Sequence, residues 1–123
     1  MGKKILVTDD DELVLISVQR LLESEGFEVA TAAGGSEALQ KAGTEIFDLV
    51  LLDIVMPGMS GYLTLEALRG MEAYRSTPIV LLSAKSAEAD REKGLKLGAT
   101  RFLTKPIDPE QLVAVIRDLG VEG

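Results

Sequence analysis

The sequence contains no cysteine and no histidine among its 123 residues. The absence of cysteine excludes disulfide bonds and thiolate metal sites, and the absence of histidine excludes imidazole catalysis and most zinc sites. Any chemistry carried out by this chain must therefore rest on carboxylates, hydroxyls, lysines and the backbone.

Long apolar runs are absent as well. The sequence has no stretch of about 18 or more apolar residues, which is the length that a membrane-spanning helix needs. The apolar segment 5–7 near the amino terminus is too short for the core of a signal peptide. We therefore expect a cytoplasmic protein without a membrane partner.

Basic residues are in the minority, with 13 Lys and Arg against 20 Asp and Glu and a net charge of −7. This balance argues against a nucleic-acid surface, because phosphate binding needs clustered cations. Most of the acidity serves solubility. With 46% hydrophobic residues and neither repeat nor linker, the chain is predicted to form one domain, residues 1–123.

Short apolar runs alternate along the chain with segments of helical spacing. Runs without polar alternation are typical of strands buried on both faces. The expected strands are 5–8, 28–31, 47–52, 78–82 and 101–104, and the expected helices are 13–25, 36–42, 62–71, 87–97 and 109–119. This alternation predicts an α/β fold with a parallel sheet covered by helices on both faces.

Several helix ends carry recognisable signals. Gly26 is placed to stop the first helix, Ser36 to cap the second and Asp108 to cap the last. The helix at 87–97 consists mostly of charged residues and alanine, and it contains Gly94, which costs about 1 kcal/mol relative to alanine. We expect this helix to be the most loosely held.

Polar side chains follow the expected strands at the same edge of the sheet. Asp9 and Asp10 follow the first strand, Asp53 the third, Ser83 the fourth and Lys105 the fifth. Two carboxylates about 4 Å apart repel by roughly 4 kcal/mol at an effective dielectric constant near 20, so the cluster requires a cation. Because all the ligands are hard oxygens, the sequence predicts Mg²⁺, with Mn²⁺ as its substitute.

A magnesium site beside an aspartate at the start of a loop indicates phosphoryl transfer to that carboxylate, Asp53, as an aspartyl phosphate. Catalysis of such a transfer consists of positioning and charge stabilisation. Mg²⁺ would neutralise one phosphoryl oxygen and Lys105 a second, while the Ser83 hydroxyl donates to a third.

Four motifs then share one order and spacing along the chain. They are Ile5-Leu-Val-Thr-Asp9-Asp10, Asp53-x-x-Met56-Pro57-x-x-x-Gly61, Ser83-Ala84 and Gly98-Ala-x-x-Phe102-Leu-x-Lys105-Pro106. Each is weak alone, but together they are specific and span essentially the whole chain. With them the sequence resembles the receiver domains of two-component response regulators, of the chemotaxis-regulator type.

The resemblance implies a doubly wound, flavodoxin-like, five-stranded parallel sheet with strand order 2-1-3-4-5. It also implies that Asp53 is the phosphoacceptor, in a self-catalysed reaction with slow autodephosphorylation rather than turnover as an enzyme. Asp10 would bind Mg²⁺ directly and Asp9 mostly through water, and the backbone carbonyl of Val55 would be a further ligand.

The resemblance further implies a switch. The Ser83 hydroxyl would move toward the phosphoryl group, and the ring of Phe102 would turn inward behind it. The Lys105–Pro106 peptide bond would be cis. The surface formed by the helix at 87–97, the last strand and the last helix would change and carry the output.

The implied partners are a sensor histidine kinase or a histidine phosphotransfer protein as the phosphoryl donor. The output would pass to a downstream effector protein or to a fused output domain, without direct contact to nucleic acid. The sequence leaves open whether phosphorylation produces a homodimer and whether the chain is part of a longer protein.

Three positions depart from the family or modulate its chemistry. Ser60 stands where the family often has aspartate, with little effect expected. Val55 and Lys85 occupy positions that set the rate of hydrolysis in the family. Because a valine admits the attacking water poorly, we expect a long-lived phosphoryl group.

Two other functions use parts of the same pattern. A phosphohydrolase of the haloacid-dehalogenase type would need a second aspartate at position 55, where this chain has valine, and a cap domain. A flavin-binding flavodoxin would need a phosphate-cradling loop after the first strand, where residues 9–12 are all acidic.

The individual residues also have ordinary structural interpretations. Asp11 and Glu12 fit the acidic first turn of a helix. Ser83 on its own would fit a cap, Phe102 a core position, and Lys105 a surface lysine.

Overall fold

The structure is a computed structural model that describes residues 2–84 and 88–122. Five strands and five α-helices alternate, with one 3₁₀ helix before the fourth strand. They are β1 (Lys4–Thr8), α1 (Glu12–Ser24), β2 (Glu28–Ala32), α2 (Gly35–Thr44), β3 (Leu49–Asp53), α3 (Gly61–Gly70), η1 (Glu72–Tyr74), β4 (Ile79–Ser83), α4 (Glu88–Leu97), β5 (Arg101–Thr104) and α5 (Pro109–Asp118).

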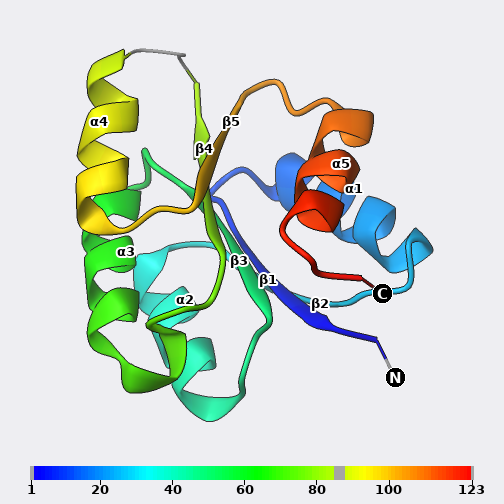
Figure 1. Ribbon diagram of the computed structural model, residues 1–123, viewed down its shortest axis with the longest axis horizontal. Helices are drawn as coiled ribbons and strands as arrows, with labels where there is room; N and C mark the ends of the chain where they lie inside the picture. The colour runs from blue at the N-terminus through cyan, green and yellow to red at the C-terminus, as the bar shows by residue number, and fades with distance from the viewer. Residues whose placement is uncertain (1, 85–87, 123) are drawn as a thin grey trace.

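The strands form one parallel sheet in the order β2-β1-β3-β4-β5. Helices α1 and α5 cover one side of it, and α2, α3 and α4 cover the other (Figure 1). This arrangement confirms the predicted doubly wound fold and its strand order. Every residue of β3 and of β4 is buried, as the unbroken apolar runs in the sequence predicted.

The alternation of side chains along each strand divides the apolar residues into two cores. On one side, Ile5 and Val7 of β1 pack with Leu22 of α1 and Leu112 of α5. On the other side, β1 contributes Leu6, which belongs to the core shared with α2 and α3. Both faces of the sheet are therefore covered by apolar cores, and the strand ends are where polar side chains can form a site.

The helix boundaries agree with the predicted segments to within a few residues, and the signals at their ends are partly confirmed. Asp108 caps α5, and Gly26 follows α1 with φ +94°. Asp11 is the N-cap of α1, where it accepts hydrogen bonds from two backbone amides, and of the two residues assigned to an acidic first turn only Glu12 lies there. Ser36 was predicted wrongly as a cap, since it lies inside α2 and Gly34 occupies the N-cap.

Helix α4 is the least buried of the five. Its predicted start at Ala87 lies outside the described residues, and among its described side chains only Gly94 is buried. From the sequence, Gly94 is expected only to lower the stability of the helix, but in the structure a close contact is made there. A Cβ atom on Gly94 would lie 2.3 Å from Cζ of Phe102 and 2.8 Å from Cδ1 of Leu81.

Within residues 2–84 and 88–122, no helix combines the length and the apolar character that crossing a bilayer requires.

Candidate functional site

The polar residues singled out in the sequence meet at the carboxyl edge of the sheet. Thr8 pairs with Leu52, which places Asp9 beside Asp53 at the ends of β1 and β3. Asp9, Asp10 and Asp53 each offer one carboxylate oxygen, and these atoms all lie within 4.8 Å of one another. The predicted cluster of three carboxylates is therefore present.

Lys105 enters this cluster from the segment that follows β5. Its Nζ lies 2.6 Å from Oδ2 of Asp9 and 3.3 Å from Oδ2 of Asp53. The Lys105 backbone amide donates to the Ser83 carbonyl at 2.7 Å, which fixes the segment against the end of β4. The peptide bond to Pro106 is cis, as the resemblance implied.

Burial makes these charges interact strongly. Asp9 is fully buried and Asp53 is only 5% exposed. Oδ1 of Asp9 accepts a hydrogen bond from the Asp11 amide at 2.9 Å, which orients the carboxylate toward the cluster. Buried carboxylates of this kind need a counter-charge, because the low local dielectric strengthens their repulsion.

The pKa of Asp53 reflects its burial and the charges around it. Burial raises it, the neighbouring charge of Asp9 raises it further, and Lys105 only partly opposes them, so that the pKa lies at about 6 against an ordinary 3.8. Burial lowers the pKa of Lys105, but its contacts with the two carboxylates outweigh burial and the net pKa is raised. Asp53 is thus ionised at neutral pH, at a cost that a second cation would relieve.

The mouth of the site is formed by exposed residues. Asp10 is exposed, and Val55, two residues beyond Asp53, is 76% exposed. A valine side chain at this place offers an approaching water neither a donor nor an acceptor. The participation of the Val55 carbonyl as a metal ligand stays a prediction, and Lys85 lies outside the described residues.

Ser83 and Phe102 lie on neighbouring strands behind the site. Ser83 ends β4, is 6% exposed and pairs with Thr104 of β5. Phe102, two residues earlier on β5, is half-buried, with its ring against Gly94 of α4. The structure therefore gives the aromatic ring a contact with α4, while the joint movement of the two side chains stays a prediction.

Gly61 holds the loop after β3 against the strand end, for a reason that the sequence does not reveal. Its amide donates to the Ile54 carbonyl at 2.8 Å. A Cβ atom at this position would lie 2.1 Å from the backbone oxygen of Asp53. Ser60, where the family often has aspartate, caps α3 by accepting from the Leu63 amide at 3.3 Å.

We expect Gly61→Ala to destabilise the protein by about 1–3 kcal/mol, because the new methyl group collides with backbone atoms that cannot rotate away. Urea unfolding measures the change. Gly43→Ala is the matched control: nothing lies within 4 Å of the added atom, and alanine in a helix should stabilise by roughly 0.5–1 kcal/mol. Equal stabilities for the two variants would contradict the packing described for Gly61.

The donor set fits the predicted magnesium ion. Three carboxylate oxygens within 4.8 Å are hard ligands, and one of the residues is exposed to water. Mg²⁺ commonly binds one or two carboxylates and keeps several waters, which this half-open arrangement allows. The cluster includes neither nitrogen nor sulfur ligands of the kind that softer metals prefer.

Comparison with known proteins gives a consistent result. A family model described as the response regulator receiver domain matches residues 5–117. The chain is 42% identical over 117 residues to the alkaline phosphatase synthesis transcriptional regulatory protein PhoP of Bacillus subtilis, covering 95% of this chain and 48% of PhoP. The chain thus spans about half the length of that relative.

Solved structures of high similarity include the chemotaxis protein CheY4 of Vibrio cholerae, with a TM-score of 0.93 and 36% identity over 96% of this chain and 98% of that one. A second is the receiver domain of the sensor histidine kinase PA1611 of Pseudomonas aeruginosa, with a TM-score of 0.88 and 29% identity over 96% and 97% of the two chains. That domain was solved with a magnesium ion coordinated in its active-site cleft.

The matched family model and the solved neighbours place this parallel sheet, with its acidic cluster, in the class of receiver domains that act in signalling. Within that class, the chain belongs to the receiver domains of two-component response regulators. The resemblance noted in the sequence is therefore confirmed. Receiver domains act in signalling rather than as enzymes on an external substrate, so neither the phosphohydrolase nor the flavin-binding alternative is supported.

Proposed function

We propose that this domain accepts a phosphoryl group on Asp53 from a sensor histidine kinase or a histidine phosphotransfer protein, in a reaction that depends on Mg²⁺. The observation that carries the proposal is the position of Asp53. It ends a buried strand, and its carboxylate shares one small site with two other carboxylates and with the ammonium group of Lys105.

Four groups would hold the metal, and the Asp53 carboxylate is one of them. Asp10, which is exposed, would bind Mg²⁺ directly, and the Val55 carbonyl would be a further ligand. Asp9 is already paired with Lys105 at 2.6 Å, so its binding through a water molecule suits the geometry. When bound, Mg²⁺ supplies charge neutralisation for a phosphoryl oxygen.

In the transfer, a carboxylate oxygen of Asp53 forms a bond to phosphorus while the bond from phosphorus to the donor's histidine nitrogen breaks. The electron pair of the broken bond stays on the imidazole. Lys105 stabilises the charge on one equatorial oxygen and the Ser83 hydroxyl that on another. Because the nucleophile is the carboxylate, Asp53 must be ionised; its pKa is about 6 in the metal-free protein, and the charge of a bound Mg²⁺ would lower it.

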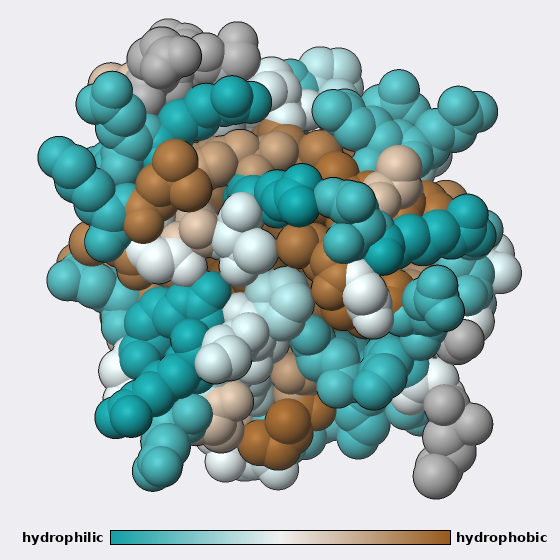
Figure 2. Space-filling view, viewed as in Figure 1, coloured by the Kyte–Doolittle hydropathy of each residue, from teal (hydrophilic) through white to brown (hydrophobic). Residues whose placement is uncertain are grey.

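The phosphorylated state would be read on the surface formed by α4, β5 and α5. The Phe102 ring joins the site to this surface through its contact with Gly94. Figure 2 shows hydrophobic patches in the upper middle of this view, broken by hydrophilic and intermediate residues, with mostly hydrophilic residues at the left and right margins. An effector protein or a fused output domain would bind here, in the cytoplasm, and residues 1–123 would form the single receiver domain.

The experiment that tests the proposal uses acetyl phosphate as the donor. Intact-mass measurement should show one added phosphoryl group in the presence of Mg²⁺, little addition in excess EDTA, and recovery when Mn²⁺ replaces Mg²⁺. Equal addition with and without EDTA would contradict the role of the metal.

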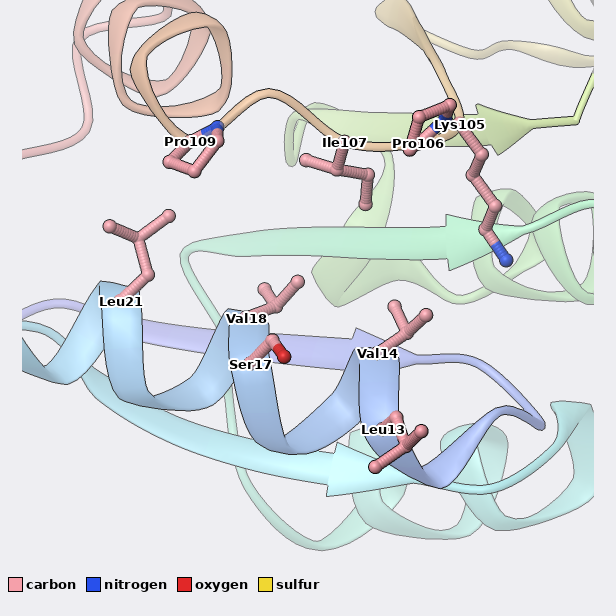
Figure 3. A pocket seen from close by; sticks show the side chains of 9 residues that line it. All are labelled: Leu13, Val14, Ser17, Val18, Leu21, Lys105, Pro106, Ile107 and Pro109. Atoms are coloured by element: carbon pink, nitrogen blue, oxygen red, sulfur yellow. The ribbon is translucent and has the colours of Figure 1, made fainter.

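A shallow apolar groove beside the site suits the donor protein. It has a volume of about 290 Å³ between α1 and the segment that leads into α5, and Lys105 lies at one end of it (Figure 3). Leu13, in the first turn of α1, lines the groove and is 75% exposed. We propose that an amphipathic helix of the donor rests here, because the groove shares Lys105 with the site that the donor must reach.

Leu13→Asp should slow phosphoryl transfer from a protein donor about tenfold or more through loss of apolar contact. The rate with acetyl phosphate should be unchanged, because the small molecule does not use the groove. Ile46→Asp is the control, since Ile46 is 60% exposed in the loop between α2 and β3. Equal slowing with both donors would show that Leu13 acts on the site itself.

We expect a phosphoryl group that persists for longer than seconds, because the exposed Val55 side chain cannot position a hydrolytic water. Val55→Asn should shorten the lifetime several-fold by offering the water a hydrogen bond. The measurement is loss of the added mass with time in Mg²⁺, after removal of the donor. Loss within seconds in the unchanged protein, or an unaltered lifetime in the variant, would contradict this role.

A further inference from the structure

Helix α4 is held mainly through its carboxyl-terminal half. Gly94 is its one buried residue among the described side chains, packed against Phe102. Among the described contacts of its amino-terminal half, the hydroxyl of Tyr62 of α3 donates to the Asp90 carbonyl at a long 3.4 Å, so the described contacts hold this half more weakly. Lys93 stacks over the same ring, with Nζ 4.4 Å from its centroid.

The carboxyl-terminal end of α4 is fixed by Arg69, which lies in the last turn of α3. Nε and Nη2 of Arg69 donate to the Gly98 carbonyl at 2.9 and 2.8 Å, and Nη2 also reaches Oγ1 of Thr100 at 3.3 Å. Nη1 donates to the carbonyls of Tyr74 and Thr77 at 2.6 and 2.7 Å. One guanidinium group thus connects four separate points of the chain.

This guanidinium is bound by carbonyl groups rather than by an acid. Within the described residues, Arg69 forms no ion pair, and burial lowers its pKa. A cation is favourable here because Gly98 lies just beyond the carboxyl-terminal end of α4, where the helix dipole is negative. The planar fork of an arginine spreads five N–H donors over three nitrogens and so reaches acceptors on separate segments, whereas a lysine offers all its donors from one nitrogen.

Gly98 is shaped for this contact. Its φ of +106° is a left-handed conformation that favours glycine, and a Cβ atom there would lie 3.1 Å from both Cγ and Nε of Arg69. Thr100, whose hydroxyl accepts from Arg69, is in turn bonded to β4 of the sheet. The Ile79 amide donates to this hydroxyl at 3.0 Å, and the Thr100 amide donates to the Ile79 carbonyl at 2.8 Å. The end of α4 is therefore tied to β4 as well as to α3.

We propose that Arg69 and Gly98 form a fixed joint, and that α4 responds to phosphorylation by moving its amino-terminal half about this joint. The trigger rests on the proposed function of Asp53, whereas the joint itself exists in the resting protein. A change in the Phe102 ring would release the contact at Gly94, but would leave the hydrogen bonds at Gly98 intact. The weakly held half is the part that costs little to rearrange.

Amide hydrogen exchange of the resting protein tests the joint. In the unchanged protein, residues 95–99 should exchange at least about tenfold more slowly than residues 92–93. In Arg69→Met the difference should fall to about threefold or less, because the bonds that fix Gly98 are lost. Exchange rates are normalised to those of the β3 amides. If Arg69→Met does not fold, Arg69→Lys replaces it as the test variant.

Tyr74→Phe is the matched control. It removes a buried hydroxyl that is bonded to the carbonyls of Ala42 and Glu45 at 3.0 and 2.8 Å, at the same corner of the molecule. It leaves the Tyr74 carbonyl free to accept from Arg69. The exchange gradient along α4 should persist in this variant. Loss of the gradient in Tyr74→Phe, or its survival in Arg69→Met, would overturn the proposal.

A second arm separates the joint from its trigger. The same proteins are phosphorylated with acetyl phosphate and Mg²⁺, with the added mass checked in each sample. In the unchanged protein, phosphorylation should alter exchange at residues 92–93 but not at 95–99. In Arg69→Met, the altered exchange should extend from residue 92 through residue 99. An equal change along the whole helix of the unchanged protein would refute the joint. Absence of added mass would refute the assignment of Asp53 as the phosphoacceptor. The exchange gradient along α4 in the unphosphorylated protein would still test the joint.

Discussion

Replacing Lys105 by methionine is expected to slow phosphorylation of Asp53 by about 100-fold, the typical effect of removing one charge-stabilising donor from a transition state. Nζ of Lys105 lies 3.3 Å from the Asp53 carboxylate, where it can meet an oxygen of the incoming phosphoryl group. The measurement is the initial rate with acetyl phosphate at saturating Mg²⁺. Lys41→Met removes a lysine that is paired with Glu37 on α2, and should leave the rate unchanged.

The same substitution should have an opposite effect on metal binding. Lys105 neutralises part of the charge on Asp9 and Asp53, so its removal leaves a more negative site, and Mg²⁺ should bind more tightly. Slower transfer together with tighter metal binding distinguishes loss of the cation from general damage. A rate within threefold of the unchanged protein, or weaker Mg²⁺ binding, would contradict this role.

Asp53→Asn is expected to stabilise the metal-free protein at pH 7 by on the order of 2 kcal/mol. The pKa of Asp53 is raised to about 6 from 3.8, so the folded protein holds this proton more tightly than the unfolded chain does. Stability from this group is therefore complete below about pH 4, falls as the pH rises to about 6, and stays low above it. The asparagine variant lacks this fall.

Urea unfolding in EDTA at several pH values between 4 and 7 measures the difference between the two proteins. The advantage of Asp53→Asn should grow across this interval. Mg²⁺ at tenfold excess over its Kd should then add about 1.4 kcal/mol to the unchanged protein, and much less to Asp10→Asn. An advantage that shrinks as the pH rises would mean that the Asp53 pKa is lowered rather than raised.

Much of the fold follows from the sequence, because its strands are buried on both faces. Unbroken apolar runs such as 78–82 identify central strands, and alternation with helices then requires parallel pairing. Parallel pairing brings the strand ends to one edge. For this reason the sequence alone predicts that Asp9, Asp53 and Lys105 meet.

The features that the sequence does not reveal depend on contacts between distant segments. Gly61 is required by the approach of the Asp53 backbone, and Gly94 by the ring of Phe102 from the next strand. Arg69 looks like a surface residue of an amphipathic helix, yet it binds Gly98, 29 positions away. Ser36 has the right residue type for a cap, but the N-cap is Gly34, two residues earlier, so composition alone misplaces the helix start.

The central claim is that Asp53 is the phosphoacceptor, and the most direct test locates the phosphoryl group. The unchanged protein, Asp53→Asn and Asp11→Asn are incubated with acetyl phosphate and Mg²⁺ and compared by intact mass. Asp11 serves as the control because it lies beside the cluster but caps α1, a role that asparagine also fills. The unchanged protein and Asp11→Asn should each gain one phosphoryl group and Asp53→Asn none. Addition to Asp53→Asn at the same rate as to the unchanged protein would contradict the claim.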